Sequence, residues 1–178
     1  MKPAGATTGE GMGERADGGM TEKMDVCTAR ESREGNDAFY VCSLIEHIAR
    51  RTQNRSSDVV RKLGSVNIAN LYEFADTYHC ENIDDVAERF IAKTGIEQGD
   101  FDNVAAARYA VPSIWDIGKV FKRLALGISA HDGVSVPEAI VRAYSSFVAD
   151  KIEDYNSAFY YDAPQNILNA YVYGQLEP

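Results

Sequence analysis

The sequence predicts an all-α protein made of two small helical subdomains that follow a disordered tail. Apolar residues recur at the i, i+3, i+4, i+7 spacing of a helix in every long periodic run of the chain. No segment shows the alternation of apolar and polar residues between hairpin turns that marks a strand. Ser, Asn or Pro precede several of the apolar runs and Gly follows them, as at helix ends.

Residues 1–35 are expected to form the disordered tail. They hold seven of the 14 glycines, few aliphatic side chains and charges of both signs. They therefore cannot bury enough surface to offset the entropy lost on ordering. All four methionines of the chain also lie in this segment, so the translation start stays open between Met1, Met20 and Met24.

Two helices are predicted at the start of the first subdomain, residues 36–95. The first begins at Asn36 and carries a helical stripe of apolar residues as far as Ala49. The second is short, Asp58–Leu63, and two serines stand before it as N-cap candidates. Gly64 closes it, because glycine suits the left-handed conformation just after a helix.

Two further helices complete a four-helix domain. The third runs from Ile68 to His79 and has one apolar face. The fourth follows Asn82, whose side chain can cap the first turn, and it ends at Gly95.

The second subdomain, residues 96–178, is expected to hold three or more helices. The helical period is lost before Pro112, which fixes a break in the chain. Ser113 and Asp116 then form a capping box, with Asp in place of the usual Glu. This box opens a helix that is predicted to stop at Gly127.

Two more helices are predicted after it. Ser135 and Glu138 form a second capping box, with Pro137 in the first turn. It opens one long helix that continues through Ile152. The last helix follows Pro164 and ends the chain.

The net charge of −9 and the pI near 4.8 limit the choice of partners. Broad contact with a phosphate backbone needs clustered Lys and Arg, so a nucleic acid is disfavoured. No run approaches the roughly 20 apolar residues of a membrane span, and the N-terminus has no apolar signal core. We therefore expect a cytoplasmic protein that does not bind a membrane.

No metal and no cofactor is expected. The three histidines are isolated, with no second His or Cys at i+3 or i+4 on the same face. Cys27, Cys42 and Cys80 are odd in number and show no short paired spacing. Neither a disulfide framework nor a zinc knuckle is therefore indicated.

Asp76 and His79 are weak candidates for catalysis. They stand at i, i+3 near the end of the predicted third helix, so the carboxylate could hydrogen-bond and charge the imidazole. The structural alternative is that His79 caps the helix C-terminus while Tyr78 completes the apolar stripe. No catalytic residue is assigned.

The first helix of the second subdomain has two apolar surfaces. Trp115 and Leu126 fall outside its core-facing arc, beside Lys119 and Lys122. A Trp next to cations suits a cation–π contact or a protein-binding anchor. Asp116, Lys119 and Arg123 share the polar side. The alternative is that another helix of the chain covers Trp115 and that Asp116 and Lys119 form an ordinary ion pair.

Four aromatic rings lie within seven residues near the C-terminus. An exposed pair, Tyr160 and Tyr161, would be a candidate hot spot because Tyr is rigid and amphipathic. The alternative is that the rings fill the gap between the last two helices. The interface candidates are Trp115, Lys119, Arg123, Leu126, Tyr155, Tyr160 and Tyr161.

Several residues of the first half follow the pattern of a known group: Phe39, Ile45-Glu46, Val60, Leu63, Leu71 and, above all, Asp76-Thr77-Tyr78-His79. On these residues, positions 36–93 resemble a short bacterial helical domain of unknown function. The second half is similar to short uncharacterised bacterial proteins through residues 112–120 and 144–146. Members of these groups are often encoded beside ADP-ribosyltransferase-like toxins, which implies a toxin-antitoxin or similar paired system.

These observations favour a non-enzymatic protein-interaction module. The resemblance implies that it is the antitoxin or regulatory partner of a toxin-like enzyme encoded by an adjacent gene. One alternative is a small enzyme with Asp76 and His79 as an acid-base pair. Another is a DNA-binding regulator with a helix-turn-helix-like element near residues 58–79. The basic residues near that element are Arg50, Arg51, Arg55, Arg61 and Lys62.

Overall fold

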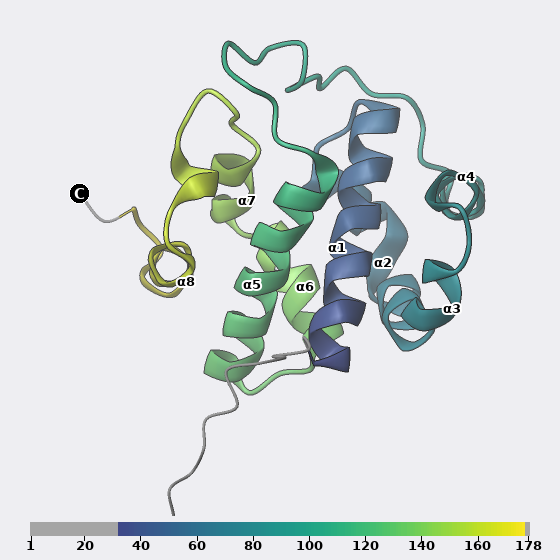
Figure 1. Ribbon diagram of the computed structural model, residues 1–178, viewed down its shortest axis with the longest axis horizontal. Coiled ribbons are helices and arrows are strands. Elements are labelled where there is room, and N and C mark those ends of the chain that lie inside the picture. Colours follow the sequence, from purple (N-terminus) through teal and green to yellow (C-terminus); the bar gives the residue numbers. More distant parts are fainter. Residues whose placement is uncertain (1–31, 177–178) are drawn as a thin grey trace, which may run out of the picture. The chain divides into compact units, whose positions relative to one another are not determined.

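Helix α1 (Arg33–Thr52) is the longest element in residues 32–176, the part of the chain that the computed structural model describes. These residues form eight α-helices and one short 3-10 helix, with no strand among them (Figure 1). The predicted all-α fold class is confirmed. The predicted tail lies outside the described range, except for its last residues, which open α1 after the Ser32 N-cap.

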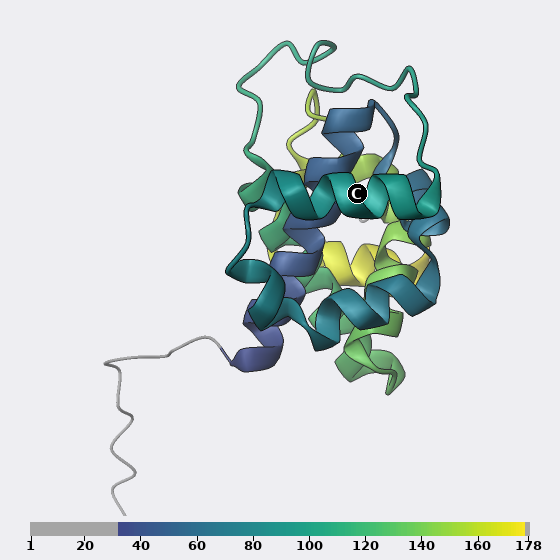
Figure 2. The same cartoon turned by 90° about the vertical axis from the view of Figure 1, so that its right-hand side faces the viewer.

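The core is built around α1. This helix packs most extensively along α5 (Ile114–Asp132), and it also contacts α2 (Ser56–Glu73) and α6 (Val136–Ser145). Figure 1 shows α5 beside α1, with α6 between α5 and α2 at the back. Figure 2 shows α4 (Ile83–Thr94) lying across the opposite side of α1.

The two predicted halves share one core. Buried apolar residues from α1 through α8 form a single cluster, and residues 32–176 belong to one compact unit. The structure therefore differs from the predicted division at residue 95, because the buried face of α1 is covered by α5 from the other half. The intervening loop, residues 95–113, returns over the end of α1, where the Gly99 N–H donates to the Thr52 carbonyl at 2.8 Å.

Helix α2 replaces the second predicted helix and most of the third. It begins at Ser56, and its helical conformation is interrupted at Gly64 (φ 73°, ψ 159°), a conformation that glycine adopts readily. The predicted break at Gly64 is confirmed. The helix then continues directly to Glu73, and α3 (Ala75–His79) follows because Phe74 leaves helical geometry. The single predicted helix over 68–79 is therefore wrong.

Helix α5 begins as predicted and ends later. The capping box is present: the Ser113 hydroxyl accepts from the Asp116 N–H, and the Asp116 carboxylate accepts from the Ser113 N–H. The predicted stop at Gly127 is wrong, because α5 continues to Gly133, which takes the left-handed conformation. Gly127 instead lies where a Cβ would meet the Leu168 side chain at 3.0 Å, so it permits close packing of α8.

The long helix predicted from Ser135 is divided in two. Helix α6 ends at Ser145 and α7 (Phe147–Ile152) begins after Ser146, whose backbone is extended (φ −88°, ψ 159°). The Ser146 hydroxyl donates to the Ala143 carbonyl at 2.7 Å, which satisfies one of the free carbonyls at the end of α6. The chain then passes through η1 (Phe159–Tyr161) to α8 (Pro164–Tyr173).

Candidate functional site

A groove of about 290 Å³ lies between α5 and the segment that joins η1 to α8. We call it the α5–α8 groove. Its α5 wall holds five residues, Asp116, Lys119, Val120, Arg123 and Leu124. Their spacing of i, i+3, i+4, i+7 and i+8 places them on one helix face. The amphipathic pattern of α5 therefore builds this wall directly.

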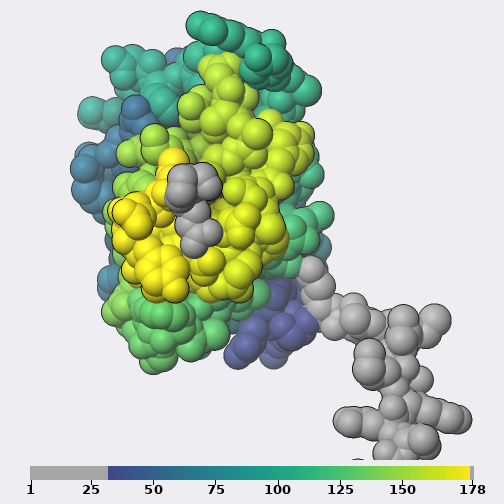
Figure 3. Space-filling model, turned by 90° about the vertical axis from the view of Figure 1, so that its left-hand side faces the viewer, coloured from purple at the N-terminus to yellow at the C-terminus, as the bar shows by residue number. Residues whose placement is uncertain are grey.

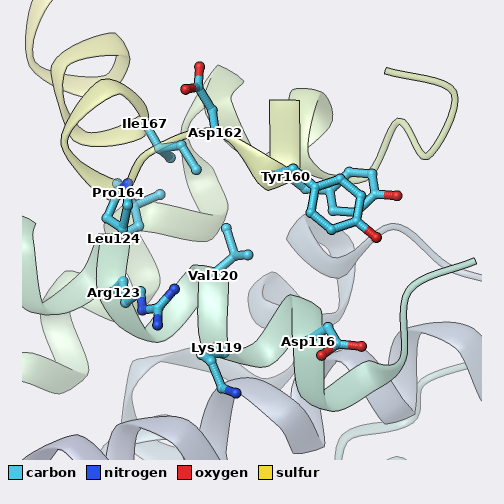
Figure 4. Close-up of a pocket in the computed structure, with 10 residues that line it drawn as sticks. Asp116, Lys119, Val120, Arg123, Leu124, Tyr160, Asp162, Pro164 and Ile167 are labelled. Atoms are coloured by element: carbon cyan, nitrogen blue, oxygen red, sulfur yellow. The ribbon is translucent and has the colours of Figure 1, made fainter. Parts of the chain in front are cut away.

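The opposite wall comes from the C-terminal segment. Tyr160 and Tyr161 belong to η1, and Asp162, Pro164 and Ile167 follow at the start of α8. Figure 4 shows the two walls facing each other, with Val120 and Ile167 between them. In Figure 3 the C-terminal segment, coloured yellow-green to yellow, forms the surface on this side of the molecule.

The base of the groove is apolar and its rim is aromatic. Leu124 and Ile167 are buried, and Tyr160 is almost fully covered. The Tyr160 ring packs edge-on against Tyr155, with the centroids 5.9 Å apart, and it also contacts the ring of Tyr161 at 4.3 Å. Tyr161 is 74% exposed. Of the two tyrosines predicted to be exposed, Tyr161 is exposed and Tyr160 is buried. The Tyr160 ring lies against the Tyr161 ring and supports it.

Both carboxylates of the groove serve local structure. Asp116 Oδ2 accepts from the Ser113 hydroxyl at 2.6 Å and from its N–H at 3.0 Å, and these bonds hold the pKa of Asp116 below its usual value. Asp162 Oδ1 accepts from the Ala163 N–H and from the Asn166 side chain, at the N-terminus of α8. Asp116 therefore completes the capping box of α5, and Asp162 holds the turn that leads into α8, so neither carboxylate forms an ion pair with a cation of the groove.

The cations of the groove are not paired. Within residues 32–176, neither Lys119 nor Arg123 makes an ion pair or a side-chain hydrogen bond, so the ion pair predicted between Asp116 and Lys119 is not formed. Both side chains are exposed on the groove wall. The groove consequently presents two unpaired cations, and two carboxylates with local hydrogen bonds, next to an apolar base.

Three other predicted interface residues lie outside the groove. Trp115 is 41% exposed, and its ring contacts the Phe39 ring of α1, with the centroids 5.9 Å apart. Helix α1 therefore covers part of Trp115, as in the alternative of an intramolecular contact. Leu126 is half-buried. Tyr155 is buried, and its hydroxyl accepts from Arg50 Nη2 at 2.7 Å. Burial raises the pKa of Tyr155 to about 12, and its predicted role at an interface does not fit this position.

Asp76 and His79 are not joined as an acid-base pair. Asp76 pairs instead with Arg33 of α1 at 3.0 Å, and the His79 ring lies edge-on to Tyr40 with the centroids 5.6 Å apart. Both residues are exposed at a hollow between α1 and α3. In the described residues no hydrogen bond links the carboxylate to the imidazole. The Asp76–His79 hydrogen bond that the enzyme hypothesis starts from is therefore not formed in this arrangement.

The basic residues considered for DNA binding are mostly neutralised. Arg51 pairs with Asp84 and Glu88, Arg55 pairs with Asp150, and Arg61 pairs with Asp58. Arg50 is turned toward Tyr155. In the region of the predicted helix-turn-helix-like element, the two helical parts of α2 meet directly at the Gly64 kink (φ 73°, ψ 159°). A phosphate backbone would have to displace these carboxylates.

A buried polar cluster was not predicted from the sequence. Glu46 and Glu153 are 1% and 2% exposed, and the Ser56 hydroxyl lies 2.9 Å from Glu46 Oε1 and 2.7 Å from Glu153 Oε1. One hydroxyl carries one hydrogen, so Ser56 donates to Glu153 and accepts from a protonated Glu46. Burial, with the nearby Glu153 carboxylate, raises the pKa of Glu46 to about 8. One feature of the sequence points to this cluster, because Glu46 places a carboxylate on the otherwise apolar stripe of α1.

Comparison with protein families, with curated proteins and with solved structures gave no match to this chain. The residues that the structure describes hold no group of three or more His, Cys, Asp or Glu arranged for a metal ion. In the same range no helix has the length and apolarity that a bilayer crossing requires.

Proposed function

We propose that this chain is a non-enzymatic protein-interaction module that binds a segment of a partner protein in the α5–α8 groove. The observation that carries the proposal is the exposed Tyr161 ring beside a small apolar groove with two unpaired cations. Tyr and Arg contribute a large share of binding energy at protein interfaces, above all where a ring is held in place by its neighbours. Tyr160 provides that support here.

The partner that we propose is the toxin-like enzyme encoded by an adjacent gene, which this chain would neutralise or regulate in the cytoplasm. This part rests on the resemblance of residues 36–93 to the bacterial helical domain named above. The groove adds a physical reason. Its volume of about 290 Å³ suits a few side chains of a polypeptide segment better than a large cofactor.

Replacing Tyr161 with Ser is expected to weaken the complex with the adjacent gene product. The loss of a supported aromatic anchor costs about 2 kcal/mol, or roughly a 30-fold rise in Kd. Co-purification establishes the complex, and isothermal titration calorimetry measures the Kd of each variant.

Tyr109→Ser is the matched control. Tyr109 is 71% exposed, close to the 74% of Tyr161, but it lies in the loop before α5 and outside the groove. Its Kd should stay within about twofold of the unmodified chain. Equal losses in the two variants would contradict the assignment of the groove, and finding no complex at micromolar concentration would contradict the proposed function itself.

A further inference from the structure

The arrangement of charge in the α5–α8 groove identifies what kind of segment it takes. Elsewhere in residues 32–176, the arginines of α1, α2 with its N-cap, α4 and α6 are engaged by carboxylates or, for Arg50, by a tyrosine hydroxyl, whereas Lys62, Arg108 and Lys151 have no carboxylate partner in that range. Lys119 and Arg123 have no such partner within that range, although the chain as a whole carries a charge of −9. Two adjacent cations are thus left free in a protein with an excess of carboxylates.

The two carboxylates that line the groove with these cations accept hydrogen bonds from other donors. Asp116 accepts two hydrogen bonds from Ser113, and Asp162 accepts two from Ala163 and Asn166. Moving Asp116 toward Lys119 would open the capping box of α5 at a cost of about 1 kcal/mol, and moving Asp162 would break its bonds to Ala163 and Asn166. Lys119 and Arg123 are therefore left to pair with a carboxylate of a ligand from outside.

We infer that the α5–α8 groove binds an acidic polypeptide segment, in which a Glu or Asp carboxylate pairs with Lys119 and Arg123 and a neighbouring aliphatic side chain packs on Val120 and Leu124. This inference rests on the proposed function. The two cations stand at i, i+4 on α5, the spacing at which two helical side chains reach one group. Arg can then make a charge-assisted, bidentate hydrogen bond to the carboxylate.

A peptide segment fits the groove better than a phosphate-rich ligand does. The cations are only two, whereas binding of a nucleic-acid backbone draws on many. The apolar base, formed by Leu124 and Ile167 and extended by Pro164, would stay uncovered under a small inorganic anion. A peptide with an aliphatic side chain next to a carboxylate would cover the apolar base and pair with the cations at the same time.

The inference is tested with two synthetic peptides and the isotope-labelled full-length chain. One peptide is acetyl-Leu-Glu-Leu-Glu-Leu-amide, and the other carries Gln in place of each Glu. Titrations followed by nuclear magnetic resonance should show chemical shift changes at residues 119–124 and 160–167. The Glu peptide should bind at least tenfold more tightly than the Gln peptide, and added salt should reduce that difference.

Charge variants of the protein provide the decisive comparison in this experiment. The double variant Lys119→Gln, Arg123→Gln should lose at least tenfold in affinity for the Glu peptide and keep its affinity for the Gln peptide. Lys62→Gln, Arg108→Gln is the control, because it removes one Lys and one Arg that lie on the surface outside the groove. It should leave both affinities unchanged, which separates local pairing from the change in net charge.

Four results would overturn the inference. The first is equal affinity for the two peptides, and the second is full competition by inorganic phosphate at the peptide's own concentration. The third is tighter peptide binding when Glu10, Glu14 and Asp17 are neutralised, which would mean that the chain's own N-terminal segment is the ligand of the groove. The fourth is a dimer that dissociates in the double variant Lys119→Gln, Arg123→Gln, which would mean that a second copy of the chain is the ligand of the groove.

The outcome can be separated from that of the proposed function. If the adjacent gene product binds through Tyr161 but its Kd is insensitive to Lys119→Gln, Arg123→Gln and to salt, the function stands and the acidic segment is wrong. If the Glu peptide binds as described but no complex forms with that gene product, the chemistry of the groove stands and the proposed partner is wrong.

Discussion

Replacing Gly118 with Ala is expected to cost about 3 kcal/mol of folding free energy, the upper range for an overpacked core. A Cβ at this position of α5 would lie 2.3 Å from Ser43 Oγ and 2.9 Å from the Ser43 Cα and N atoms of α1. The obstacle is backbone, so no side-chain rotation can remove it. The two helices that form the centre of the fold would have to move apart, which offsets the gain of about 1 kcal/mol in helix propensity from Gly to Ala.

Gly127→Ala is the matched control in the same helix. Its Cβ would meet only the end of the Leu168 side chain, at 3.0 Å and beyond, and that side chain can turn aside. The helix-propensity gain is the same, so we expect a change of less than about 1 kcal/mol of either sign. Urea denaturation of both variants measures the difference. Similar stabilities for the two would mean that α1 and α5 do not cross as closely as the structure has them.

Raising the pH from 5 to 8 is expected to lower the free energy of unfolding by about 4 kcal/mol, because one pKa unit corresponds to about 1.36 kcal/mol. Burial raises the pKa of Glu46 to about 8, against an ordinary value of 4.5. Between these two values the folded chain holds a proton that the unfolded chain has released. The stabilisation is therefore complete below pH 4.5 and is lost as the pH rises through 8. Burial raises the pKa of Glu153 as well, which acts in the same direction.

Glu46→Gln checks the assignment of this pH dependence. The amide keeps the size of the side chain and can donate to the Ser56 hydroxyl, as the protonated carboxyl does. We expect the variant to lose most of the slope between pH 5 and 8 and to exceed the unmodified chain in stability at pH 8.5. Denaturation series at four pH values measure both effects. An unchanged slope would show that the proton is held elsewhere in the protein.

The parts of the fold that sequence reasoning identified are those that short-range chemistry decides. The capping box of Ser113 and Asp116 is closed within four residues, and the break at Gly64 follows from the backbone freedom of glycine. Lys119 and Arg123 lie on the groove wall because helical spacing alone puts them on one face. Such features need no knowledge of which helices meet.

The features that were missed depend on contacts between distant segments. The local sequence around Gly127 is typical of a helix end, but in the fold Gly127 is the place where the Leu168 side chain approaches α5. Tyr155 resembles a surface aromatic in the sequence, yet Arg50, 105 residues earlier, holds its hydroxyl in the interior. Asp76 likewise pairs with Arg33 rather than with its sequence neighbour His79. None of these partners can be read from a local pattern.

Hydrogen exchange of the full-length chain, with and without the adjacent gene product, is the most direct test of an interaction module that acts through the α5–α8 groove. Binding should slow the exchange of backbone amides in residues 156–168, which include η1 and the first turn of α8, because a bound segment covers them and resists local opening. The loop at residues 95–113 should be unaffected. Slowed exchange around α3 and α4 with no change at 156–168 would contradict the assignment.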